Sequence, residues 1–112
     1  MNLISDLAQK SKELDAAINT LRDNGERLAV AEHDYKITLR QEALKLRAEQ
    51  DMPVTLINQI IYGVPEVAEL RLKRDIAETI YQTNQEFINK TKLQMRILES
   101  QVNREWGHNG NS

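Results

Sequence analysis

The sequence predicts an all-α protein, a long antiparallel, coiled-coil-like helical hairpin with a short helix in its connector. Three observations favour this fold. Apolar residues recur every seven positions in the first half, an apolar stripe recurs every three or four positions in the second half, and a segment with two prolines and a glycine separates them. The 112 residues include only 4 Gly, 2 Pro and 4% aromatic residues, which fits one helical domain over residues 1–106.

The first helix is predicted over residues 3–50, which contain no proline. A turn-like Asp23-Asn24-Gly25 interrupts it, but the seven-residue repeat keeps its phase across the interruption. We therefore expect one continuous helix, with a weak point at Gly25 that costs roughly 1 kcal/mol relative to Ala. The predicted seam consists of Ile4, Leu7, Leu14, Ile18, Leu21, Leu28, Tyr35, Leu39 and Leu46.

The connector is predicted over residues 51–64. Pro53 ends the first helix, a short apolar helix follows, and Gly63 ends it just before Pro65, which suits the first turn of the next helix. This short helix is interpreted as an apolar plug at the end of the hairpin. A helix-turn-helix that reads DNA is the alternative, but the segment offers only Asn58 and Gln59 to bases.

The second helix is predicted over residues 65–106, followed by a polar, disordered tail over 107–112. Pairing residues by equal distance from the turn places Leu39 beside Ile76 and Tyr35 level with Tyr81, with Trp106 beyond the first turns of the other helix. Asn84 and Thr91 interrupt the stripe and are expected to fix the register. The stripe consists of Leu70, Ala77, Tyr81, Asn84, Ile88, Thr91, Met95, Leu98, Val102 and Trp106, widened by Ile80 and Phe87.

Both helices carry a second set of apolar residues, opposite or beside the seam. Helices that are apolar on two sides are usually covered on two sides, so we expect a homo-oligomeric helical bundle, most simply a four-helix dimer. The alternative is that the connector folds back over part of this second set. The predicted interface residues are Val30, Ile37, Leu44, Leu72, Ile76, Leu93 and Ile97.

Composition argues against several classes of protein. Without Cys, the chain forms neither a disulfide nor a Cys-ligated metal site, and a net charge of −2 lacks the basic footprint of a dedicated nucleic-acid binder. No apolar run reaches the length of a membrane span, and the polar start is unlike a secretory signal, so a cytoplasmic location is expected. His33 and His108 lack ligand spacing. We expect no enzyme activity, metal or cofactor.

Basic side chains gather weakly on each helix. In an assembly they could converge on an anionic ligand, helped by the free N–H groups at the start of the second helix. The alternative is a solvated charged face, because acidic residues are interspersed; Arg71 with Asp75 and Arg74 with Glu78 have the spacing of surface ion pairs. The candidate ligand-binding residues are Arg40, Lys45, Arg47, Arg71, Arg74, Lys92 and Arg96.

Six short stretches, at residues 24–25, 29–35, 44–47, 52–55, 67–75 and 104–106, carry a resemblance that covers residues 20–107. The chain resembles small helical proteins encoded by phages and prophages of Gram-positive bacteria. This resemblance carries over no functional residue, but it implies a protein that works in the host cytoplasm by binding a component of the host.

The expected function is therefore counter-defence by stoichiometric capture. The captured molecule would be a host protein or, as in sponge proteins, an anionic nucleotide signal of antiviral defence. Two alternatives remain open: a DNA-associated accessory or regulatory protein of phage DNA metabolism, which the low basic content does not favour, and a purely structural assembly coiled coil.

Overall fold

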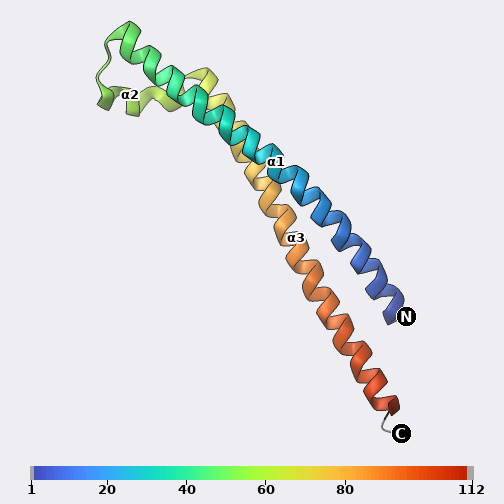
Figure 1. Cartoon of the computed structure of the whole chain (residues 1–112). Helices are drawn as coiled ribbons and strands as arrows, with labels where there is room; N and C mark the ends of the chain where they lie inside the picture. Colours follow the sequence, from blue (N-terminus) through green and yellow to red (C-terminus); the bar gives the residue numbers. More distant parts are fainter. Residues whose placement is uncertain (1, 111–112) are drawn as a thin grey trace. The chain divides into compact units, whose positions relative to one another are not determined.

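The computed structural model describes residues 2–110, and the side chains of residues 2–107. The described chain is helical almost throughout and contains no strand, as predicted (Figure 1). Its elements are helix α1 (Leu3–Gln50), helix α2 (Val54–Ile60), the 3₁₀ turn η1 (Ile61–Gly63) and helix α3 (Pro65–Gly110). No helix in the described part of the chain is long and apolar enough to cross a bilayer.

The chain divides into two compact units. The hairpin unit is Asn24–Tyr81, and the terminal unit contains the described residues up to Asp23 and from Gln82 onward. α1 and α3 each contribute to both units, and α1 is continuous through Gly25, as predicted. The boundary in α1 falls within the turn-like tripeptide that begins at Asp23.

Backbone hydrogen bonds explain where α1 begins and ends. The side chain of Asn2 caps its start, since the N–H groups of Ile4 and Ser5 donate to Asn2 Oδ1 at 3.1 and 3.2 Å. Its end is marked by Asp51, which adopts a left-handed conformation with φ of 49°. The N–H of Met52 then donates to the Leu46 carbonyl at 3.3 Å, which reverses the chain before Pro53.

The end of α3 differs from the prediction. The helix was expected to stop at Trp106 before a disordered tail over 107–112, but it continues to Gly110. The tail contains no proline, so nothing removes a backbone N–H or blocks the next turn, and each Gly costs only about 1 kcal/mol relative to Ala. Residues 111–112 of the predicted tail lie outside the described residues.

The core of the hairpin unit lies where the connector meets both long helices. Tyr35, Ile57, Ile61 and Val67 are buried together, which confirms that the short connector helix is an apolar plug. The half-buried residues around this cluster come from the last turns of α1, the connector and the first turns of α3: Leu39, Ala43, Leu46, Met52, Val64 and Leu70.

This plug changes the register of the long helices. A β-carbon at Gly25 would lie only 3.3 Å from Cε2 of Tyr81, so Gly25 faces Tyr81. The prediction that Tyr81 lies level with Tyr35 is therefore wrong by ten residues, or about 15 Å along the helix. Counting equally from the turn ignored α2 and η1, which pack on the last turns of α1. For the same reason Leu39, which was predicted to lie beside Ile76, packs against the core cluster.

The terminal unit has a narrower core. Ala17, Ile88 and Thr91 are buried, and the two polar residues of the stripe have partners. The Thr91 hydroxyl donates to the Phe87 carbonyl at 2.9 Å, and the Asn84 amide donates across the helix pair to the Ala17 carbonyl at 3.1 Å. The bond from Asn84 fits the predicted role of this residue in fixing the register.

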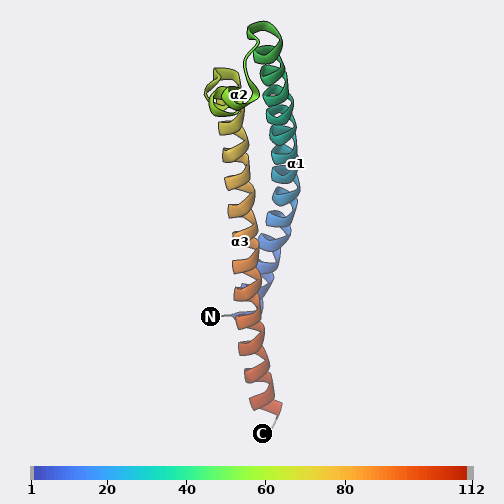
Figure 2. The ribbon, with the colours of Figure 1, turned by 90° about the vertical axis from the view of Figure 1, so that its left-hand side faces the viewer.

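The seam is narrower than predicted. Leu7, Leu14 and Leu21 of the terminal unit are partly buried, but Ile4 and Ile18 are 58% and 46% exposed. Two helices bury one narrow stripe on each other, so residues at its edges stay in water. The residues expected to widen the stripe of α3, Ile80 and Phe87, are also about half exposed. The last turns of α3 run past the start of α1, and Trp106 is exposed there (Figure 2).

Candidate functional site

The second set of apolar residues is exposed in the single chain. All seven predicted interface residues are between 43% and 62% exposed. Single exposed apolar residues are normal on a protein surface, but an ordered series of them marks an interaction surface. Five lie in the hairpin unit, which are Val30, Ile37, Leu44, Leu72 and Ile76, and two in the terminal unit, Leu93 and Ile97.

The total surface supports the same interpretation. The chain exposes 8396 Å². A compact monomer of its mass, 12.9 kDa, is expected to expose about 6,300 Å², which leaves an excess of about 2,100 Å². A stable protein–protein interface takes about 800 Å² from each partner, and obligate interfaces take more. The excess is therefore large enough for more than one such interface.

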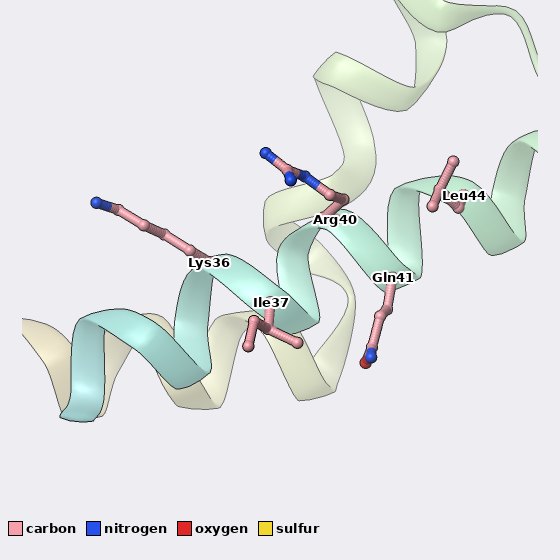
Figure 3. Close-up of a pocket in the computed structure, with 5 residues that line it drawn as sticks. All are labelled: Lys36, Ile37, Arg40, Gln41 and Leu44. Carbon is pink, nitrogen blue, oxygen red and sulfur yellow. The ribbon is translucent and has the colours of Figure 1, made fainter.

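The exposed apolar residues of α1 do not form a continuous surface. Val30, Ile37 and Leu44 follow one another at intervals of seven, so one occurs every two turns. In Figure 3, Lys36 and Arg40 extend from one side of the helix, and Ile37 and Gln41 lie on the other side. Every residue that lines this hollow comes from α1, so it is an open depression on one helix.

The exposed residues of α3 are closer together. Leu72, Ile76 and Ile80 are spaced by four, so one occurs on nearly every turn, and we call them the α3 stripe. Ile76 and Ile80 also line a groove of about 170 Å³ within the hairpin unit. The groove is formed by Asn24 and Arg27 of α1 together with Lys73, Ile76, Ala77 and Ile80 of α3. It combines an apolar floor with two cations.

The connector adds a third, smaller exposed set. Val54, Leu56, Ile60 and Tyr62 are between 39% and 59% exposed, on the side of α2 and η1 away from the core. The guanidinium of Arg71 lies 4.9 Å from the centre of the Tyr62 ring and covers part of it. The connector contains no Lys or Arg, and its exposed polar residues are Asp51, Thr55, Asn58 and Gln59.

The candidate ligand-binding residues of α3 in the hairpin unit contact aromatic rings. Arg71 lies over Tyr62, and Arg74 lies 4.8 Å from the centre of the Tyr35 ring. Arg74 Nε also donates to Asp75 Oδ1 at 2.7 Å, and this hydrogen bond raises the pKa of the guanidinium. Arg74 therefore forms an ion pair with Asp75, its neighbour in sequence. Arg71 was expected to pair with Asp75, but its guanidinium stacks on the Tyr62 ring instead.

The other candidate ligand-binding residues have separate surroundings. Arg47 Nη1 donates to the Met52 carbonyl at 3.0 Å, and Lys45 Nζ lies 3.6 Å from the carboxylate of Glu42. Arg40 lines the depression of Figure 3, and the other six candidates line neither it nor the groove. The remaining two, Lys92 and Arg96, are exposed in the terminal unit.

The terminal unit also has an open hollow of about 420 Å³ between its two helical segments, lined by polar side chains together with Ile97 and Leu98. Lys10 and Glu13 form an ion pair there with 3.2 Å between Nζ and Oε2.

His33, in the hairpin unit, is exposed and lies 3.3 Å from Asp34, which fits a solvated residue. Among the described side chains, no three His, Asp or Glu residues gather as a metal site.

Of the residues that line the groove, only Ile76 was predicted as an interface residue. Ala77 and Ile80 were assigned to the stripe of the second helix, and Arg27 and Lys73 were not considered as site residues. The spacing of Leu72, Ile76 and Ile80 at intervals of four is the signal that identifies the stripe.

A comparison of the chain with known protein families, curated proteins and solved structures found no match.

Proposed function

We propose that the protein is a non-enzymatic binding protein that works as a homo-oligomeric helical bundle. The observation that carries this proposal is the ordered set of exposed apolar residues on α1 and α3. Burying a Val, Leu or Ile side chain that is half exposed contributes about 1 kcal/mol, so several of them together drive association.

Sedimentation velocity on the full chain tests the assembly. We expect an oligomer at micromolar concentration, and we expect Ile37→Asp and Leu72→Asp to keep the helical circular dichroism but to lower the molecular mass. Thr79→Asp is the matched control, because Thr79 is an exposed residue of α3, the helix that contains Leu72, and lies outside the apolar set. A wild-type chain that stays monomeric over the whole concentration range would contradict the proposal.

The resemblance to phage proteins supports counter-defence by stoichiometric capture as the role of this bundle. Of the two classes of captured molecule, a host protein is better supported than an anionic nucleotide. Four of the five candidate basic residues in the hairpin unit already contact a ring, a carboxylate or a carbonyl: Lys45, Arg47, Arg71 and Arg74. An exposed apolar surface favours a protein partner.

Two assays separate this role from the others. Thermal unfolding in the presence of cyclic and linear nucleotides tests nucleotide capture, because a ligand that binds the folded state raises the melting temperature. Filter binding to DNA at low salt tests the DNA-associated alternative, because contacts with phosphates are strongest there. For capture of a host protein we expect no stabilisation by nucleotides and no retention of DNA.

A further inference from the structure

We propose that the groove of the hairpin unit binds the α3 stripe of a second copy in antiparallel orientation, with the two-fold axis at Ile76. This inference rests on the proposed homo-oligomer and specifies which surface forms it. The groove is lined by Asn24, Arg27, Lys73, Ile76, Ala77 and Ile80.

The α3 stripe is complementary to itself. Leu72 and Ile80 lie four residues on either side of Ile76, and all three are about half exposed. When two copies run antiparallel about Ile76, each Ile76 meets its counterpart and Leu72 of one copy meets Ile80 of the other. A two-fold interface requires such a self-complementary patch. Ala77, beside Ile76 in the groove, is small enough to let a second helix approach.

The charges at the edge of the groove fit the same orientation. Arg27 lines the groove together with Ile80. The antiparallel arrangement brings the Leu72 end of the second copy to this place, and with it Glu69, three residues before Leu72 on the same face of the helix. Glu69 forms an ion pair with Lys73 at 3.7 Å, and both side chains are more than 60% exposed, so this ion pair is weak. Glu69 is therefore available to Arg27 of the second copy.

The other exposed apolar sets fit a second copy less well. On α1 the apolar residues occur once every two turns, and Lys36 and Arg40 line the same depression as Ile37 and Leu44. A second helix on that face would bury unpaired cations, which is costly. The α3 stripe has an apolar residue on nearly every turn and a groove beside it.

Single-cysteine variants test the arrangement, because the chain contains no Cys. A disulfide needs two Cβ atoms within about 4.5 Å, so its formation reports a specific pair of residues. Under mild oxidation we expect Ile76→Cys to form a covalent dimer. Leu72→Cys and Ile80→Cys should each remain monomeric on a denaturing gel, whereas an equimolar mixture of these two variants should form the mixed dimer. Thr79→Cys is the matched control, because Thr79 is exposed on α3 but lies outside the apolar set.

The outcomes distinguish this inference from the proposed function. Efficient cross-linking of Leu72→Cys with itself indicates a parallel pair and contradicts the arrangement. If the wild-type chain sediments as an oligomer but neither Ile76→Cys nor the mixture cross-links, the groove is not the interface, while the proposed function stands. If the wild-type chain is monomeric, both fail. Circular dichroism of each variant checks that its helical content is unchanged.

Discussion

Asp51 offers a direct test of how α1 ends. Its φ of 49° is the only positive value among the described residues other than glycine, and it places an L-amino acid in the left-handed region. The same residue puts a carboxylate just beyond the C-terminal end of a 48-residue helix, where the helix dipole is negative. Both features destabilise the folded state, so a substitution that removes them should stabilise the protein.

The size of the effect follows from three contributions. Asp51→Gly removes a strain of about 1 kcal/mol and an unfavourable dipole interaction of about 0.5 kcal/mol. The greater freedom of Gly in the unfolded chain offsets about 0.5 kcal/mol of this gain. We therefore expect a net stabilisation of about 1 kcal/mol, or about 5 °C in melting temperature for a domain of this size.

Two further substitutions at this position separate the contributions. Asp51→Asn tolerates the left-handed conformation equally well and removes only the charge, so it should gain about 0.5 kcal/mol. Asp51→Ala removes the charge but increases the strain, so its net effect should be close to zero. Urea unfolding followed by circular dichroism, at one fixed protein concentration, measures the series. The reasoning is refuted if Ala stabilises as much as Gly.

Three other predictions address the helix pairs. Leu28→Asp puts a charge into the seam of the hairpin unit and should abolish most of the helical circular dichroism at 25 °C; retention of the wild-type spectrum would contradict the seam. Thr91→Val removes the hydroxyl that donates to the Phe87 carbonyl and should lower the free energy of unfolding by about 1 kcal/mol, whereas Thr91→Ala, which also leaves a cavity, should cost more. Gly25→Ala gains about 1 kcal/mol of helix propensity but crowds Tyr81, so we expect little net change in the melting temperature. Gly25→Leu should lower the melting temperature by several degrees. An equal effect of both variants would show that Tyr81 does not crowd this site.

Much of the fold could be predicted from local patterns. The bounds of α1 followed from an unbroken heptad repeat and from Pro53, and the connector helix followed from the apolar run between Pro53 and Gly63. These signals are local, because propensity and periodicity act within a few turns. The continuation of α3 to Gly110 was missed, since a polar segment without proline carries no strong signal for either helix or coil.

The register could not be predicted by counting from the turn. It depends on how many turns of α1 the plug covers, and this is a tertiary property of Ile57 and Ile61. The candidate surface was predicted only in part for the same reason. Exposure of Leu72 and Ile76 was anticipated, because they lie away from the seam. The role of Arg27 required knowledge of which turn of α1 faces which turn of α3.

The location of the apolar plug has a consequence for how such a chain varies over evolution. The hairpin unit contains its own buried cluster and its own groove between Asn24 and Tyr81. Deleting or duplicating one heptad in each arm of the terminal unit would leave both features intact. Natural variants of different length are therefore expected to keep the sequence near the bend and to gain or lose matched multiples of seven residues at the two ends.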